Sequence, residues 1–151
     1  MNKLSEILKS EAKLPLSKQL VLNLLCTNNY IAEQYTCFFK THDITGPQYN
    51  VLRILRGQKG KPANLTTIQE RMVHKNSNAG RLVDKLLEKG YVERKICEKN
   101  RRKIEVIITT KGKHKLESIN PGLEALEEKG VDKLSIEEIK TLNSLLEKLR
   151  E

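Results

Sequence analysis

The chain has 151 residues, of which 38% are hydrophobic, 4% aromatic and 31% charged, and its formal net charge is +9. This length fits one domain, or a compact domain with helical extensions. No apolar run approaches the ~20 residues that a membrane-spanning helix requires, and the first residues lack the apolar centre of a signal peptide. We therefore expect a cytoplasmic protein without a membrane segment.

The positive charge is concentrated in the middle of the chain. From Arg53 to Lys115 there are 18 Lys or Arg and 6 Asp or Glu, a balance of +12, whereas the rest has 10 and 13, a balance of −3. Such segregation favours a polyanionic partner, with nucleic acid first and an anionic membrane surface second. No basic amphipathic helix with bulky aromatic residues supports the membrane surface.

The first part of the chain predicts two helices. Residues Leu16 to Phe39 lack glycine and proline and repeat apolar residues at helical spacing, which predicts one long helix. A second helix is expected after Thr45, which can cap it, with Gln48 completing a capping box and Pro47 in the first turn. GQKGKPAN then predicts a loop.

A shorter pair of helices follows this loop. LTTIQERMV predicts a short helix, with Thr66 and Gln69 as its capping pair and Ile68, Met72 and Val73 as its buried stripe. After a turn of about three residues, a second helix is expected with Asn76 as its N-cap and Gly90 as its C-terminal stop. Two helices in this arrangement indicate a helix-turn-helix unit.

The pattern changes to strands after Gly90. YVERKIC and KIEVIIT alternate polar with β-branched or aromatic residues, and the charged EKNRRK between them is suited to an exposed turn. The sequence therefore predicts a β-hairpin with a cationic tip.

Two further helices complete the chain. Thr109 is expected to cap the first of them, Asn120-Pro121 to break or kink it, and Gly130 to end it. Ser135 and Glu138 form a capping box for the terminal helix. Its apolar residues share one face and are Ile136, Ile139, Leu142, Leu146 and Leu149.

The start of the second helix of the helix-turn-helix is expected to read DNA bases. In such units the N-terminal residues of the second helix reach base edges in the major groove. Asparagine can pair with adenine and arginine with guanine, each pair giving roughly 1–3 kcal/mol of discrimination. A helix cap followed by solvated side chains is the alternative interpretation. The residues expected to contact DNA here are Lys75, Asn76, Ser77, Asn78 and Arg81.

A helix-turn-helix followed by a two-stranded hairpin is a winged helix, so the sequence predicts this fold. Arg101, Arg102 and Lys103 would lie at the wing tip, where they suit phosphate contact or insertion into a narrow minor groove. A winged helix used for protein interaction, with incidental basicity, is the alternative from another functional class.

Four segments resemble the MarR (multiple-antibiotic-resistance regulator) family, whose pattern is an Asp-x-Arg wing followed by Leu-Thr-x-x-Gly. They are ITGPQYNVLRIL, LTTIQERM, NSNAGRLVDKLLEKGYVERK and NRRKIEVIITTKG. The resemblance covers about residues 16 to 151. It implies a mainly α fold with a small β-hairpin, in which a winged helix-turn-helix (about 45–112) lies between dimerisation helices (about 1–43 and 113–151).

The resemblance also implies a function. Members of the family are homodimeric transcription regulators, most often repressors, and a dimer implies a pseudo-palindromic operator. A small-molecule effector that binds the free dimer more tightly than the DNA-bound one lowers operator affinity. The residues expected near such an effector are Phe38, Tyr49 and His114.

Two departures from the family pattern affect the expected function. Asn100 replaces the aspartate that orients the wing arginine, here Arg102, so we expect a less rigid wing tip. Val21 stands where the hydroperoxide-sensing branch has its reactive cysteine. We expect Cys26 and Cys37 to act as small buried hydrophobic residues, and a thiol-based redox-sensing regulator stays an alternative.

The remaining reactive residue types are scattered. His42, His74 and His114 form no His-x-x-x-His pair, and the cysteines, Cys97 included, have no Cys-x-x-Cys spacing. There is no recognisable catalytic triad or glycine-rich phosphate loop. We expect no metal, no cofactor and no enzymatic activity.

Overall fold

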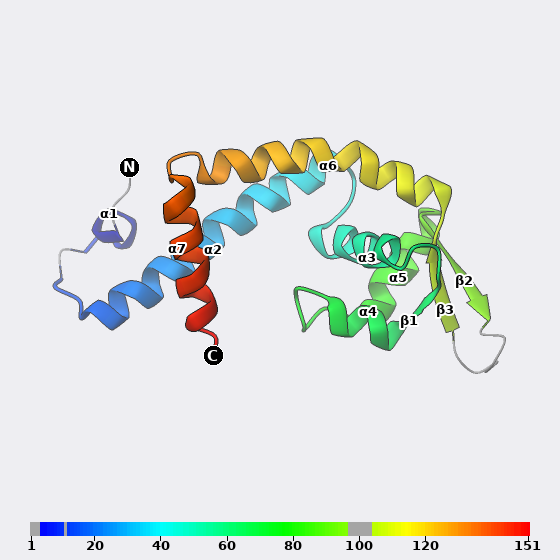
Figure 1. The fold of residues 1–151 in the computed structure, drawn as a ribbon, viewed down its shortest axis with the longest axis horizontal. Coiled ribbons are helices and arrows are strands. Elements are labelled where there is room, and N and C mark those ends of the chain that lie inside the picture. The colour runs from blue at the N-terminus through cyan, green and yellow to red at the C-terminus, as the bar shows by residue number, and fades with distance from the viewer. Residues whose placement is uncertain (1–3, 11, 97–103) are drawn as a thin grey trace.

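In a computed structural model of the chain, the structure describes residues 4–10, 12–96 and 104–151 (Figure 1). The described part is mostly helical with a small antiparallel sheet, as the sequence predicts. Its elements are α1 (Leu4–Leu8), α2 (Leu16–Thr41), α3 (Gly46–Gly57), β1 (Ala63–Asn64), α4 (Leu65–Arg71), α5 (Ala79–Glu88), β2 (Val92–Ile96), β3 (Ile104–Ile108), α6 (Thr110–Val131) and α7 (Ile136–Lys148). None of the described helices is both long and apolar enough to cross a membrane.

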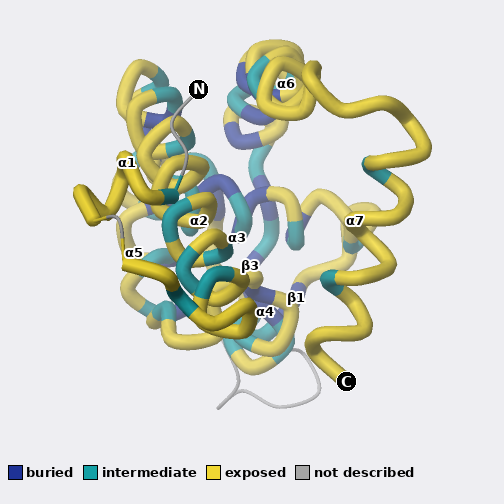
Figure 2. Tube along the Cα trace, turned by 90° about the vertical axis from the view of Figure 1, so that its left-hand side faces the viewer, coloured by how far each residue is buried: buried dark blue, intermediate teal, exposed yellow. Residues whose placement is uncertain are grey.

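The chain divides into a body and an arm. The body contains α3 to β3 and the first half of α6; the arm contains α1, most of α2, the second half of α6, and α7 (Figure 1). Most buried apolar side chains lie in the body, and α2 contributes only Phe39 to them. Among the described residues, α1 and α7 have no buried member, and Figure 2 shows α7 almost entirely exposed.

The hairpin predicted after Gly90 is present, and a third strand joins it. β2 pairs with β3 in an antiparallel register that places Val92 opposite Ile108. β1 pairs with the other edge of β3, with Ala63 opposite Val106. The predicted loop GQKGKPAN therefore ends in a strand that the sequence did not reveal. The four paired residues are buried on one face of the sheet and are Ala63, Val92, Val106 and Ile108.

Four predicted helix ends are confirmed, and one of them is the Thr109 cap of α6, whose hydroxyl accepts from the Gly112 N–H. The Gln48 N–H donates to Thr45 Oγ1 (3.3 Å) and the Thr45 N–H to Gln48 Oε1 (3.0 Å), which is the predicted capping box of α3. Ser135 and Glu138 form the same reciprocal pair at α7. Gly90 follows the end of α5 with a φ of 70°, a left-handed conformation that glycine adopts at little cost.

Two predicted N-caps are wrong. The α4 cap is Asn64, whose Oδ1 accepts from the Thr67 N–H (2.8 Å), so the predicted pair of Thr66 and Gln69 does not form. The α5 cap is Asn78 rather than Asn76, because the first buried residue of that helix is Ala79. In both cases a nearby asparagine with extended backbone is the actual cap.

Of the break or kink predicted at Asn120-Pro121, the break does not occur, and the predicted burial of Val73 is wrong. α6 runs through Pro121 without a break, because Ile119 and Leu123 are buried on either side of it and the Tyr49 hydroxyl donates to Asn120 Oδ1 (2.9 Å). Val73 is 76% exposed instead of buried. α4 ends at Arg71, two residues earlier than predicted, so Val73 lies beyond the helix face that packs on the body.

Candidate nucleic-acid interface

The α4–turn–α5 unit is anchored by one buried face of α5. Ala79, Val83 and Leu86 are spaced by four and three residues, so they form a continuous stripe on the helix, and each is at least 96% buried. Leu82 and Leu87 pack beside this stripe. The polar residues at the start of α5 consequently face away from the body.

Gln69 fixes the turn between the two helices. Its Nε2 donates to the Lys75 carbonyl oxygen (2.7 Å), and its Oε1 accepts from the Ala79 N–H (3.1 Å). One side chain of α4 thus holds both the middle of the turn and the first residue of α5. Sequence reasoning assigned Gln69 to a capping box and missed this role, because the same glutamine can satisfy either pattern.

The structure brings four of the five residues predicted around this tip to one open hollow. Asn76, Asn78 and Arg81 are exposed, Ser77 is half-buried, and all four line a surface hollow of about 730 Å³. Lys75 is exposed just before them, and its Nζ donates to the Glu70 carbonyl oxygen (2.5 Å). The hollow therefore presents amide, hydroxyl and guanidinium groups to solvent at the N-terminal end of α5.

The two asparagines of the tip are not equivalent. Asn78 Oδ1 accepts from the Arg81 N–H (3.0 Å), so the oxygen needed for a bidentate contact with adenine is already engaged. A Cβ on Gly80 would lie 3.3 Å from the same oxygen, so the glycine leaves room for this cap. Asn76 is an exposed residue.

Ion pairs distinguish the cations around the tip. Farther along α5, Lys85 pairs with Glu88 (2.9 Å), and Asp84 pairs with Arg94 of β2. Arg81 forms no ion pair with any residue in the described ranges. Arg81 is therefore the cation of α5 whose charge is available to an external anion.

The wing is tied to the body at its base. The Thr109 hydroxyl donates to the Gly90 carbonyl oxygen (2.8 Å) and accepts from the Gly112 N–H (3.1 Å). A Cβ on Gly112 would lie only 2.2 Å from the Tyr91 carbonyl oxygen. Thr109-x-x-Gly112 thus joins the end of α5, the wing and α6 at one tight contact. Asn100, Arg101, Arg102 and Lys103 lie outside the described residues.

The three residues expected near an effector have different surroundings. Phe38 and Tyr49 each pack against the ring of Phe39, with centroid distances of 5.4 and 5.0 Å, whereas His114 is exposed on α6. Burial, the strongest influence, raises the pKa of Tyr49.

The expected burial of the cysteines is wrong for the single chain. Cys26 is half-buried and Cys37 is exposed, both on α2, and Cys97 lies outside the described residues. Eleven residues of helix separate the first two by about 16 Å, far beyond the reach of a disulfide. No three metal-ligating side chains of the described residues gather to hold a metal ion.

Comparison with known proteins gives a consistent result. The model of the MarR family matches residues 44–104, which run from just before α3 to the first residue of β3. The HTH-type transcriptional regulator SarZ of Staphylococcus aureus strain USA300 is 31% identical over 98 residues, which are 65% of each chain.

Solved structures share the fold over most of the chain. A MarR transcription factor from Planctomyces limnophilus is 26% identical with a TM-score of 0.71, over 90% of this chain and 98% of its own. BpsR of Bordetella bronchiseptica, whose DNA binding is regulated by 6-hydroxynicotinic acid, is 18% identical with a TM-score of 0.80, over 93% and 99%.

Proposed function

We propose that the chain is a member of the MarR family of transcription regulators and that it binds double-stranded DNA sequence-specifically as a homodimeric repressor. The observation that carries this proposal is the exposed polar tip of α5, set on a buried apolar stripe within the segment of charge +12. A partner that is DNA also favours a cytoplasmic location.

Base reading is assigned to Asn76 and Arg81. Both are exposed at the start of α5, and Arg81 has no competing ion pair in the described structure. Asn78 is assigned a capping role, with only its amide nitrogen left for DNA. Lys75 and Ser77 would add phosphate or sugar contacts. The wing contacts predicted for Arg101, Arg102 and Lys103 belong to the same proposal.

The homodimer would form through the arm. Leu20, Leu25 and Ile31 of α2 and Leu142 and Leu145 of α7 are apolar side chains that are about half exposed. Large apolar side chains exposed along two helices suit an interaction site. We propose that residues of about 1–43 and 113–151 interlock with a second copy, which places two α5 helices on two half-sites of a pseudo-palindromic operator.

We propose that a small-molecule effector releases the operator. The similarity to BpsR, whose DNA binding responds to 6-hydroxynicotinic acid, supports a ligand-dependent mechanism for this chain. An effector weakens DNA binding only by its difference in affinity between the free and the DNA-bound dimer.

The test is duplex binding by variants at several salt concentrations, using operator fragments selected from genomic DNA. Arg81→Ala and Asn76→Ala should each reduce discrimination between operator and unrelated duplex by roughly 1–3 kcal/mol. Asn78→Ala should instead lower the free energy of unfolding by about 1 kcal/mol, because a helix cap is lost. Lys133→Ala, a change in the loop before α7, is the control and should leave discrimination unchanged.

Phosphate contact has its own signature. The logarithm of affinity should fall with the logarithm of salt concentration with a slope of about −0.9 per neutralised phosphate. Arg102→Ala with Lys103→Ala should reduce this slope on every duplex. A quadruple variant that also carries Asn76→Ala and Arg81→Ala, yet binds duplex DNA as well as the parent, would overturn the proposal in favour of a protein-interaction module.

A further inference from the structure

The backbone just before α5 holds two groups that could pair to make the helix longer. In an α-helix, a backbone N–H donates to the carbonyl oxygen four residues before it. The Ala79 N–H and the Lys75 carbonyl oxygen have this spacing, so a bond between them would add Asn76, Ser77 and Asn78 to α5. In the structure both groups are bonded to a side chain instead, and α5 begins at Ala79.

The carboxamide of Gln69 takes the place of that backbone bond. Its Oε1 accepts from the Ala79 N–H (3.1 Å), and its Nε2 donates to the Lys75 carbonyl oxygen (2.7 Å). A primary amide has both an acceptor and donors, so one side chain satisfies the two groups that a longer helix would join. Ala79 is buried, and a buried N–H that loses its partner is costly, so the bond to Ala79 is the more important of the two.

Other contacts fix the rest of the turn between α4 and α5. The Val73 N–H donates to Asn50 Oδ1 of α3 (2.9 Å), which holds the chain where α4 ends. The Ser77 N–H donates to the His74 carbonyl oxygen (3.1 Å) and closes a tight turn. Residues 74–78 are therefore the segment whose conformation depends on the side chain of Gln69.

We infer that Gln69 determines the residue at which α5 begins, and thereby which side chains the tip presents to DNA. It is a positioning residue, because it acts through the backbone of the tip. The inference rests on the proposed function, in which Asn76 and Arg81 read bases. On one continuous helix these two residues would lie about 140° apart around the axis, so they could not both face the same base edges.

Backbone NMR of the full chain tests the helix start without DNA. Gln69→Met introduces an unbranched helix-forming side chain and removes both hydrogen bonds. The freed backbone groups should bond to each other, so the Cα chemical shifts of residues 76–78 should become helical. Thr66→Met, at an exposed position of the same helix, is the matched control and should keep the parental shifts. Parental shifts in Gln69→Met, or random-coil shifts at Ala79, would overturn the inference.

A second variant separates the two hydrogen bonds. Gln69→Glu can still accept from the Ala79 N–H, but its carboxylate cannot donate to the Lys75 carbonyl oxygen. Since the Ala79 N–H is the donor that a longer helix would use, α5 should still begin at Ala79. Thr66→Glu introduces the same charge into α4 and is the control. If Gln69→Glu gives helical shifts at residues 76–78, the bond to Ala79 does not set the helix start.

DNA binding tests the consequence for base reading. Gln69→Met should lower the ratio of operator affinity to affinity for an unrelated duplex at least about tenfold, because a base contact is displaced. Affinity for the unrelated duplex and its salt dependence should stay parental, because the cations that contact phosphate remain. An equal loss of affinity for every duplex, or a shifted helix start with parental discrimination, would contradict the positioning role.

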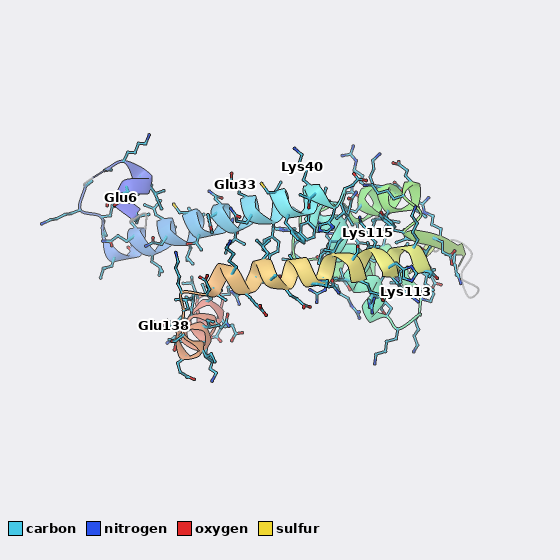
Figure 3. All side chains as sticks on the ribbon, turned by 90° about the horizontal axis from the view of Figure 1, so that it is seen from above. Glu6, Glu33, Lys40, Lys113, Lys115 and Glu138 are labelled. Atoms are coloured by element: carbon cyan, nitrogen blue, oxygen red, sulfur yellow. The ribbon has the colours of Figure 1, made fainter. Side chains whose placement is uncertain are left out.

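The arm provides a check on the same variant. Figure 3 shows Glu6 of α1 and Glu138 of α7 away from the body, which contains α4 and α5. Gln69→Met should therefore leave the oligomeric state of the parent unchanged, as measured by sedimentation. A change in oligomeric state would mean that the loss of discrimination comes from the dimer and not from the tip.

These measurements distinguish the inference from the proposed function. If Gln69→Met shifts the helix start as expected but the parent binds no operator, the proposed function fails and the role of Gln69 at the start of α5 stands. If the parent binds its operator but Gln69→Met changes neither the chemical shifts nor the discrimination, the inference fails and the function stands.

Discussion

The two ends of α6 show how differently the body and the arm are stabilised. At the body end, Leu116 and Ile119 are fully buried and Gly112 is in backbone contact with Tyr91. At the arm end, α6 leads into α7, which has the same kind of amphipathic pattern but no buried residue in the described structure. Similar sequence patterns therefore have opposite outcomes: one apolar face is buried within the chain, and the other stays exposed in the described structure.

The largest effect expected from this contrast is at Gly112. Gly112→Ala should lower the free energy of unfolding by about 4 kcal/mol or more, because the new Cβ would meet a backbone oxygen that no side-chain rotation can move. Urea denaturation at a fixed protein concentration measures this change.

The matched control is Gly130→Ala in the last turn of the same helix. A Cβ on Gly130 has no neighbour within 4 Å. Alanine is the better helix former, so this change should raise stability by up to about 1 kcal/mol. If the two alanine variants are equally stable, the contrast between the ends of α6 is wrong.

The next effect concerns the apolar face of α7. Leu142→Glu with Leu145→Glu should raise the dissociation constant of the dimer at least about a hundredfold, because each buried leucine contributes roughly 1.5–3 kcal/mol. Sedimentation measures the dissociation constant, and circular dichroism should show that the body remains folded. Ser144→Glu, on the opposite face of α7, should leave the dimer intact. A double variant that stays dimeric would place the dimer contact elsewhere.

The smallest effect is expected within the arm, where α2 contacts the second half of α6. The Tyr35 hydroxyl of α2 donates to Glu127 Oε1 of α6 (2.6 Å), and burial, followed by this hydrogen bond, raises the pKa of Tyr35 from 10.0 to about 12. Tyr35→Phe should cost about 1 kcal/mol at neutral pH.

The effect of Tyr35→Phe should depend on pH. Since the folded chain keeps a proton that the unfolded chain releases above pH 10, this stabilisation is complete below pH 10 and disappears as the pH rises to about 12. The difference in stability between parent and variant should therefore shrink over that interval. A constant difference would show that Tyr35 is not protected by Glu127.

Much of the fold could be predicted from local patterns. The two predicted capping boxes join residues three positions apart, so each needs only neighbouring backbone groups to form its hydrogen bonds. Both form as expected, Thr45 with Gln48 and Ser135 with Glu138. The alternation of polar and apolar residues on both sides of the hairpin turn likewise predicts β2 and β3. These features depend on residues a few positions apart, which a sequence displays directly.

The errors have a tertiary origin. Asn76 and Asn78 have the same capping chemistry, and the choice between them depends on Ala79 being the first residue to pack on the body. β1 has two residues and exists because β3 has a free edge beside it. At the candidate site, the spacing of apolar residues along α5 predicts that Asn76 and Arg81 are exposed. The role of Gln69 depends on the folded turn, which brings the Lys75 carbonyl oxygen and the Ala79 N–H to its side chain.

Because α6 continues through Pro121, its length determines how far a tilt at one end displaces the other end. Its 22 residues form a rod of about 33 Å at 1.5 Å per residue. With the body fastened at one end, a tilt of about 10° at the other end displaces the body by about 6 Å over a rod of that length. In the proposed dimer the half-sites on DNA would lie ~34 Å apart, so a displacement of about 6 Å of one body corresponds to about a sixth of that spacing.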